Sequence, residues 1–163
     1  MRVSVWVAVV CPGTSRVLLA KRGPSARNAG RWNFFGGGID DGEHPEETAL
    51  RELSEEAGID TERQSLIYLG DCFTGSKRNL LFVVTAEAEF DPIINHESQD
   101  WCWIAIEDLL SLRRLHGPTA KLSPLVRGWV KTLPPVPLVA ADPVRRGNGW
   151  DWLVRQVAKH WPG

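Results

Sequence analysis

Residues 36–59 read GGGIDDGEHPEETALRELSEEAGI, a glycine run followed by the strongest helix signal in the chain. Pro45 suits the first position of a helix, and the two glutamates after it suit the positive end of the helix dipole. Gly58 is a typical residue just beyond a helix C-terminus. The sequence therefore predicts a helix over residues 45–57.

The predicted helix carries two stripes, because successive residues turn by about 100° around its axis. The apolar stripe, which packs, consists of Ala49, Leu50, Leu53 and Ala57. The acidic stripe consists of Glu52, Glu55 and Glu56. Like charges three or four positions apart repel by roughly 0.2–0.5 kcal/mol per pair, so something should compensate them.

The residues before this helix change the meaning of the acidic stripe. A fourth carboxylate, Glu43, comes just before it, and the consecutive glycines at 36–38 let the backbone approach a ligand closely. Such a carboxylate cluster is hard to hold together without a divalent cation, and an all-oxygen site suits Mg²⁺ or Mn²⁺. The alternative is a solvated acidic face with Arg51 as a partial counter-ion.

The whole stretch resembles the signature of the Nudix (MutT-type) hydrolases without a gap or a substitution. The matching pattern is Gly37-x5-Glu43-x7-Arg51-Glu52-Leu53-x-Glu55-Glu56-x-Gly58-Ile59. The resemblance implies a Mg²⁺-dependent enzyme, with Mn²⁺ as the alternative ion, that hydrolyses a nucleoside diphosphate linked to another moiety. Water would attack one phosphorus of the pyrophosphate, a reaction that needs charge neutralisation and an oriented nucleophile.

The same resemblance assigns metal ligands within this box. Glu55 and Glu56 are expected as the principal ligands, helped by a backbone carbonyl near Gly36. Glu43 would close the cluster. In the loop before the last strand, Glu97 is expected to join the metal site.

The resemblance also implies catalytic roles. Glu52 would bind metal or take the proton from the attacking water, and Arg51 would hold Glu52 in place by a charge-assisted pair. The identity of the base stays open, so the expected catalytic set is Arg51, Glu52, Glu55 and Glu56. His96 is either a base or a solvated loop residue.

The segment GRWNFFGG at 30–37 is similar to the W-N-x-F-G-G stretch of Nudix enzymes that hydrolyse nucleoside triphosphates, including oxidised purine forms. Asn33 would hydrogen-bond a base edge, or else it is a polar residue directed outward from a short strand. Gly37 and Gly38 are expected at the substrate, and Arg22 is either a phosphate contact or a solvated loop charge. These features favour a (d)NTP or an oxidised purine nucleoside triphosphate, cleaved to a nucleoside monophosphate and pyrophosphate.

Other substrates and one other class of function stay open. Nucleotide sugars, ADP-ribose and dinucleoside polyphosphates compete with nucleoside triphosphates, although the region at 70–74 lacks the proline that ADP-ribose hydrolases usually carry. A non-catalytic nucleotide-sensing module is the alternative of another class. Such modules commonly lose box carboxylates, and this chain keeps all of them.

The rest of the sequence predicts a mixed sheet sandwiched between helices, an α/β (α+β) Nudix fold. Alternating apolar residues and turn signals predict strands over 3–11, 16–22, 32–35, 66–73, 80–90 and 101–104. Helical spacing predicts further helices over 107–115, 118–133 and 150–160. The expected organisation is a hydrolase domain over 1–133, then a Pro-rich linker and a Trp-rich C-terminal helix over 134–163 that packs on the same domain.

Composition limits where this domain acts. The 163 residues carry a formal net charge of −1, which gives no global attraction to nucleic acid or to an anionic membrane. The three cysteines form no C-x-x-C pair, and the N-terminal apolar run is too short to span a bilayer. A cytoplasmic protein with a nucleotide substrate and without membrane or nucleic-acid partners is expected. A homodimer is also expected, since Nudix proteins are often dimers.

Overall fold

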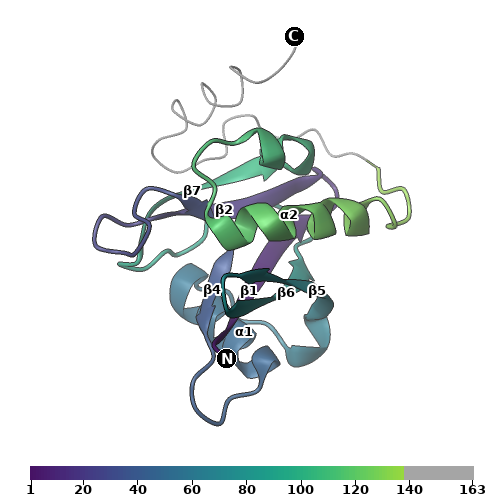
Figure 1. Ribbon diagram of the computed structural model, residues 1–163. Helices are drawn as coiled ribbons and strands as arrows, with labels where there is room; N and C mark the ends of the chain where they lie inside the picture. The colour runs from purple at the N-terminus through teal and green to yellow at the C-terminus, as the bar shows by residue number, and fades with distance from the viewer. Residues whose placement is uncertain (138–163) are drawn as a thin grey trace.

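A computed structural model describes residues 1–137 of the chain (Figure 1). The predicted C-terminal helix over 150–160 and most of the predicted linker lie outside these residues. The strands are β1 (Val3–Cys11), β2 (Arg16–Arg22), β3 (Trp32–Asn33), β4 (Phe35–Gly38), β5 (Ile67–Thr74), β6 (Lys77–Thr85) and β7 (Ser98–Ala105). The α-helices are α1 (Pro45–Ala57) and α2 (Gly117–Val130), and the 3₁₀ segments are η1 (Arg63–Ser65) and η2 (Ile106–Ser111).

Within residues 1–137 the seven strands form one mixed sheet centred on β1. One edge of β1 pairs in parallel with β6 from Val3 to Val10. The other edge pairs antiparallel with β4 through residues 4–7 and with β2 through residues 9–11. β2 also pairs with β3 and with β7, and β5 pairs with β6. The change of partner along β1 leaves the glycine-rich β4 beside the start of β1.

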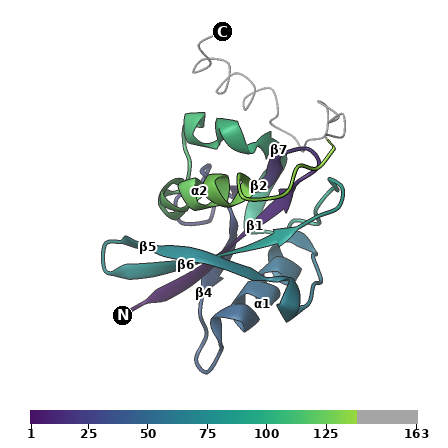
Figure 2. The same ribbon diagram turned by 90° about the vertical axis from the view of Figure 1, so that its right-hand side faces the viewer.

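The two α-helices cover opposite faces of this sheet, as Figure 2 shows. The hydrophobic cluster that includes α1 takes from β1 the residues Val5, Val7, Val9 and Cys11. The cluster that includes α2 takes from β1 the residues Trp6, Ala8 and Val10. Because both faces are buried, β1 reads as an almost continuous apolar run. The mixed sheet between helices that the sequence predicts is therefore confirmed.

Helix α1 has the bounds that the sequence predicts, because both of its ends depend on local signals. At the N-terminus, the His44 backbone N–H donates to the Glu47 carboxylate over 2.8 Å, one half of a capping box. At the C-terminus, Gly58 has φ 65°, and its N–H donates to the Ser54 carbonyl over 3.1 Å. That left-handed conformation favours glycine and ends the helix.

Four strand predictions differ from the structure. The strand predicted over 66–73 is shifted by one residue, since β5 covers Ile67–Thr74. The predicted strand over 32–35 is two short strands with different partners, since β3 pairs with β2 and β4 pairs with β1. The predicted strand over 80–90 begins earlier and ends at Thr85, where the ladder with β1 also ends. Beyond Thr85, the ring of Phe90 packs edge-on against the ring of Trp103. Phe90 therefore belongs to the hydrophobic core but not to a strand. β7 is longer at both ends than the predicted 101–104.

The predicted helix over 107–115 is a 3₁₀ segment, η2, that covers only Ile106–Ser111. The chain then turns, with Arg114 at φ 63°, so that it can run beside β3. There the Trp32 N–H donates to the Arg114 carbonyl over 2.9 Å. α2 begins one residue before the predicted position and ends at Val130. No helix of residues 1–137 is long and apolar enough to cross a bilayer.

Candidate active site

A cavity of about 1150 Å³ opens where β4 and α1 meet the loop at 22–31, the β5–β6 turn and the start of α2. One part of its lining, here called the acidic wall, consists of Glu52, Glu55, Glu56 and Glu97. The predicted substrate residues Arg22, Asn33, Gly37 and Gly38 line the same cavity. The fold thus brings together box residues and residues far from the box in sequence.

Glu56 and Glu52 are the two buried members of the acidic wall that α1 contributes, and Glu56 contacts the backbone of β4. It is 8% exposed, and its Oε2 accepts a hydrogen bond of 2.8 Å from the Gly36 N–H. Burial raises the pKa of Glu56 to about 9; the nearby carboxylates of Glu52 and Glu97 also raise it, and the Gly36 hydrogen bond opposes them. Gly36 therefore contacts the cluster through its amide in this structure, whereas the sequence predicts its carbonyl as a metal ligand.

Glu52 lies against the glycine run of β4. An added Cβ at Gly37 would overlap Glu52 Oε1, so only glycine permits this close approach. Burial raises the pKa of Glu52, although the charge of Arg51 acts in the opposite direction. Arg51 Nη1 donates to Glu52 Oε1 over 3.0 Å. The predicted pairing of Arg51 with Glu52 is therefore present in the structure.

Arg51 has a second and tighter partner in Glu43. Arg51 Nε donates to Glu43 Oε1 over 2.7 Å, and Nη2 donates to Oε2 over 3.1 Å. Hydrogen bonds from Arg51 and from Thr48 lower the pKa of Glu43 to about 2. Glu43 does not line the cavity. It contacts the acidic wall through Arg51, and its predicted place as a direct metal ligand stays a prediction.

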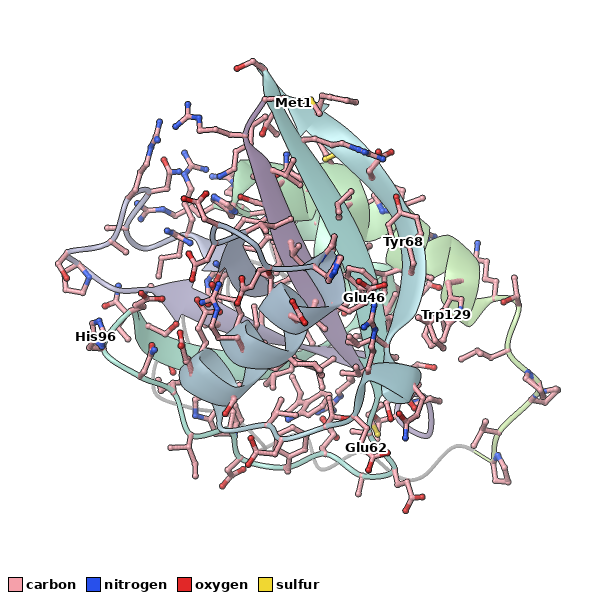
Figure 3. The ribbon with its side chains drawn as sticks, turned by 90° about the horizontal axis from the view of Figure 1, so that it is seen from below. Met1, Glu46, Glu62, Tyr68, His96 and Trp129 are labelled. Atoms are coloured by element: carbon pink, nitrogen blue, oxygen red, sulfur yellow. The ribbon has the colours of Figure 1, made fainter. Side chains whose placement is uncertain are left out.

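Glu55 and Glu97 complete the acidic wall from two directions. The Glu55 side chain is 56% exposed and lies 3.5 Å from Arg51 Nη1. Glu97 comes from the loop before β7, where His96 is also found (Figure 3). The Gly23 N–H donates to the Glu97 carbonyl over 2.8 Å and holds this loop beside the end of β2. Glu97 contacts Glu56 closely enough to raise its pKa, as expected for a member of the same cluster.

The acidic wall has the donor chemistry of a divalent-cation site. As they stand, no three His, Cys, Asp or Glu side chains within residues 1–137 are arranged so that they enclose an ion. Two buried carboxylates, Glu52 and Glu56, nevertheless lie beside Glu97, and their mutual repulsion in a desolvated place is unfavourable without a positive charge. Clustered carboxylate oxygens are ligands that hard divalent ions prefer. The residues present therefore fit such an ion.

Two buried polar atoms on the α2 side of the cavity were not expected from the sequence. Ser4 Oγ and His116 Nδ1 have no hydrogen-bond partner among the described residues, and the two residues are 0% and 7% exposed. Both line the cavity, as does Asn33, which is 5% exposed. His116 immediately precedes α2, and its ring lies 5.1 Å from the Trp6 ring. The sequence signal that could have pointed to Ser4 is that it interrupts the apolar run of β1.

The profile of the NUDIX domain matches residues 1–126 of the chain. The "Putative 8-oxo-dGTP diphosphatase 3" of Mycobacterium tuberculosis is 34% identical over 106 residues, which make up 61% of this chain and 49% of that protein. The "8-oxo-dGTP diphosphatase" of Proteus vulgaris is 36% identical over 66 residues, or 40% of this chain and 59% of that protein. The chain thus spans about half the length of the curated relatives it matches.

Solved structures agree with the observed fold. The crystal structure of the MutT NUDIX hydrolase from Burkholderia pseudomallei superposes with a TM-score of 0.60 at 30% identity. The superposition covers 77% of this chain and 97% of that one.

Proposed function

The chain belongs to the NUDIX-domain family, and from this premise we propose that it is a pyrophosphohydrolase that cleaves a nucleoside triphosphate to a nucleoside monophosphate and pyrophosphate. The family generally uses divalent metal ions, and Mg²⁺ is the proposed ion here. The observation that carries the proposal is the acidic wall, in which Glu52 and Glu56 are buried beside Glu97 in one cavity. A solvated acidic face would not bury two carboxylates.

The acidic wall would hold the ion. Glu52, Glu55, Glu56 and Glu97 are the proposed ligands in this chain. When bound, a divalent ion supplies charge neutralisation for the pyrophosphate and lowers the pKa of a coordinated water. Gly36 and Gly37 provide no side chain, so the carboxylates of Glu56 and Glu52 can lie close to the backbone of β4.

Glu52 is the proposed acceptor of the proton from the attacking water. Arg51 holds Oε1 of this carboxylate at 3.0 Å, and Arg51 is itself fixed by two hydrogen bonds to Glu43. Among the described residues, no hydrogen bond involves Oε2, so this atom can accept a proton from water. A base that is held by these successive hydrogen bonds keeps its orientation during the reaction. Arg51 and Glu43 are therefore proposed as positioning residues.

The α2 side of the cavity is the proposed place of the nucleobase. Asn33, Ser4 and His116 present polar atoms there, and a buried polar atom without a partner costs about 1–3 kcal/mol. The donors and acceptors on a base edge would remove that cost. Trp6, which packs on the α2 face of the sheet, adds buried aromatic surface to the same lining. Two of the relatives are named as 8-oxo-dGTP diphosphatases, and this supports oxidised purine nucleoside triphosphates as the first substrates to test.

The first experiment is a hydrolysis screen with Mg²⁺ and with Mn²⁺, in which products are identified by mass. The panel contains (d)NTPs, oxidised purine triphosphates, ADP-ribose, nucleotide sugars and dinucleoside polyphosphates. Release of pyrophosphate from a nucleoside triphosphate supports the proposal. Selective cleavage of a sugar nucleotide, ADP-ribose or a dinucleotide would replace the substrate assignment, and silence across the panel would favour a nucleotide-sensing module.

Variants then test the site. Glu52→Gln and Glu56→Gln should lower kcat by about 10²–10⁴-fold while circular dichroism stays unchanged, because each removes a charge that the reaction needs. Glu46→Gln is the matched control: this helix carboxylate pairs with Arg63 at the surface and does not line the cavity. Parental turnover by both acidic-wall variants would contradict the assignment.

A further inference from the structure

Asn79 is a buried polar residue on the α2 face of the sheet. It lies on β6, where the alternate residues Leu81 and Val83 pack in the hydrophobic cluster of that face. Asn79 is 0% exposed, so its amide occupies a position that the alternation of β6 would give to an apolar side chain. A buried amide costs free energy unless it is hydrogen-bonded. The partners of Asn79 therefore indicate what this polar residue does.

The Asn79 amide uses both of its polar ends. Its Oδ1 accepts a hydrogen bond of 3.0 Å from the Trp6 indole Nε1–H on the neighbouring strand β1. Its Nδ2 donates to Thr74 Oγ1 over 2.9 Å and to the Lys77 carbonyl over 3.3 Å, on the two sides of the β5–β6 turn. All three partners line the cavity, and Asn79 itself does not. Asn79 thus supports two parts of the cavity lining from behind.

The Trp6 ring is the first of these two parts. An added Cβ at Gly36 would lie 2.9 Å from Trp6 Cε3, so the ring packs directly against the glycine run of β4. The His116 ring, which immediately precedes α2, lies 5.1 Å from the Trp6 ring in an edge-on arrangement. These two contacts limit where the ring lies, and the hydrogen bond to Asn79 fixes how the indole is turned.

The β5–β6 turn is the second part. It projects beyond the ladder between β1 and β6, which begins at Val3 and Arg78. The turn residues 75–76 line the cavity. The two hydrogen bonds that Asn79 donates tie both ends of this turn to the sheet. The position of the turn therefore depends on a residue that does not line the cavity.

We propose that Asn79 is a positioning residue for nucleotide binding, because it orients the Trp6 ring and the β5–β6 turn toward the nucleoside part of the substrate. This inference rests on the proposed function for the place of the nucleobase. The acidic wall is held separately, by Arg51 and by the Gly36 N–H. Loss of the Asn79 contacts should therefore weaken nucleotide binding and leave the chemical step nearly unchanged.

The test measures kcat and KM for 8-oxo-dGTP with Mg²⁺, and the Kd of 8-oxo-dGMP in EDTA by calorimetry. Asn79→Leu removes the three hydrogen bonds at similar volume. It should raise KM and Kd by about 10-fold and leave kcat within about threefold of the parental value. Ser123→Ala is the control, because the Ser123 hydroxyl makes a buried hydrogen bond of 2.6 Å to the Thr119 carbonyl away from the cavity lining. This control should keep the parental KM and Kd.

Asn79→Asp should restore most of the binding. The carboxylate can still accept from the Trp6 indole, and the Thr74 hydroxyl can donate to it instead of accepting. The contact with the Lys77 carbonyl is lost, since a carboxylate has no donor. Equal losses of binding in Asn79→Asp and Asn79→Leu would show that these hydrogen bonds do not account for the effect.

A spectroscopic measurement on the parental protein tests the same link without a substitution that could disturb folding. In ¹⁵N-labelled protein, the Trp6 indole N–H and the Asn79 side-chain amide should both shift when 8-oxo-dGMP binds in EDTA. Each resonance is assigned from a variant that lacks it, Trp6→Phe or Asn79→Leu. Trp103 is the internal control, because its indole donates to the Phe90 carbonyl over 2.8 Å and does not line the cavity. Its resonance should stay in place.

The outcomes separate this inference from the proposed function. Hydrolysis of 8-oxo-dGTP with parental KM and Kd in Asn79→Leu overturns the inference and leaves the proposed function standing. A fall in kcat with an unchanged Kd also overturns it, since Asn79 would then act on the chemical step. Weaker binding of 8-oxo-dGMP in this variant, without hydrolysis by the parental protein, supports the inference and contradicts the proposed function.

Two further outcomes are decisive. If Asn79→Leu does not fold, the parental resonances decide, and an unmoved Asn79 amide in the presence of bound 8-oxo-dGMP overturns the inference. A parental protein that neither binds 8-oxo-dGMP nor hydrolyses 8-oxo-dGTP contradicts both the inference and the choice of oxidised purine substrates.

Discussion

At the scale of single residues, the close approach of Glu52 to Gly37 determines where the Glu52 carboxylate lies in the acidic wall. A side chain at position 37 would overlap the carboxylate that Arg51 orients. Gly37→Ala should therefore lower kcat/KM by about 10²-fold, since Glu52 must move away from its position. Gly38→Ala is the control, because an added Cβ there meets nothing within 4 Å. Similar activity of the two variants would show that the close approach does not matter.

Protonation of His116 should lower the stability of the fold at acidic pH. Its folded pKa of about 4 lies below the ordinary value of 6.5, so the unfolded chain binds the proton first. The neutral ring thus stabilises the fold above pH 6.5, and this contribution is lost as the pH falls from about 6.5 toward 4. We expect a loss of about 1–2 kcal/mol, discounted for partial solvent screening, between pH 7 and pH 5.

Urea unfolding at these two pH values measures that loss. In His116→Gln the difference in unfolding free energy between pH 7 and pH 5 should shrink by the same amount, because glutamine does not titrate. An unchanged pH dependence in the variant would assign the acid sensitivity to other groups.

At the scale of elements, Gly58, which follows α1, and Gly128, which lies inside α2, should respond to alanine substitution with opposite signs. Gly58→Ala should destabilise the protein by about 1–2 kcal/mol, because φ is 65° and the added Cβ would lie 2.9 Å from Ile93 Cβ. Gly128→Ala lies inside α2, where an added Cβ meets nothing within 4 Å, and should stabilise by about 0.5–1 kcal/mol.

Thermal or chemical denaturation of the two variants in parallel checks both signs. Because both substitutions add one methyl group to glycine, the comparison removes the general effect of the change. A stabilising Gly58→Ala would contradict the described end of α1.

Elements also differ in how far their own sequence determines them. α1 was predicted correctly because Pro45 and Gly58 are end signals that act within one turn. The strands over 32–35 and 80–90 were predicted with wrong limits, because a strand ends where its neighbour ends. Phe34, for example, is 0% exposed and lies between two strands that pair with different neighbours.

At the scale of the whole molecule, the buried carboxylates couple metal binding to stability. Binding of an ion to the folded state alone raises the unfolding free energy with ion concentration. Mg²⁺ at millimolar concentration should therefore raise the Tm of the parental protein by a few degrees, roughly 2–8 °C for each 1 kcal/mol. Glu52→Gln/Glu56→Gln should lose this increase.

The same double variant should have a higher Tm than the parental protein in EDTA. Burial raises the pKa of both carboxyl groups, that of Glu56 to about 9, so the fold must pay to protonate or to bury them at neutral pH, and amides avoid this cost. Scanning fluorimetry with EDTA and with Mg²⁺ measures both effects. An equal Mg²⁺ response in the parental protein and in the variant would place the ion elsewhere. The predicted homodimer and the predicted cytoplasmic location stay predictions, as does the division of the chain at residue 133.

The sequence by itself was sufficient for the family and for the helix that bears the acidic wall. The box residues lie within 23 positions of one another, so local spacing determines their common face. Asn33, Glu97 and Arg22 were proposed from the resemblance, but their meeting in one cavity depends on strand pairing across long separations. The burial of Ser4 and the burial of His116 were not predicted. They arise where segments from the N-terminus, two loops and α2 meet, and no local pattern records which distant segments will become neighbours.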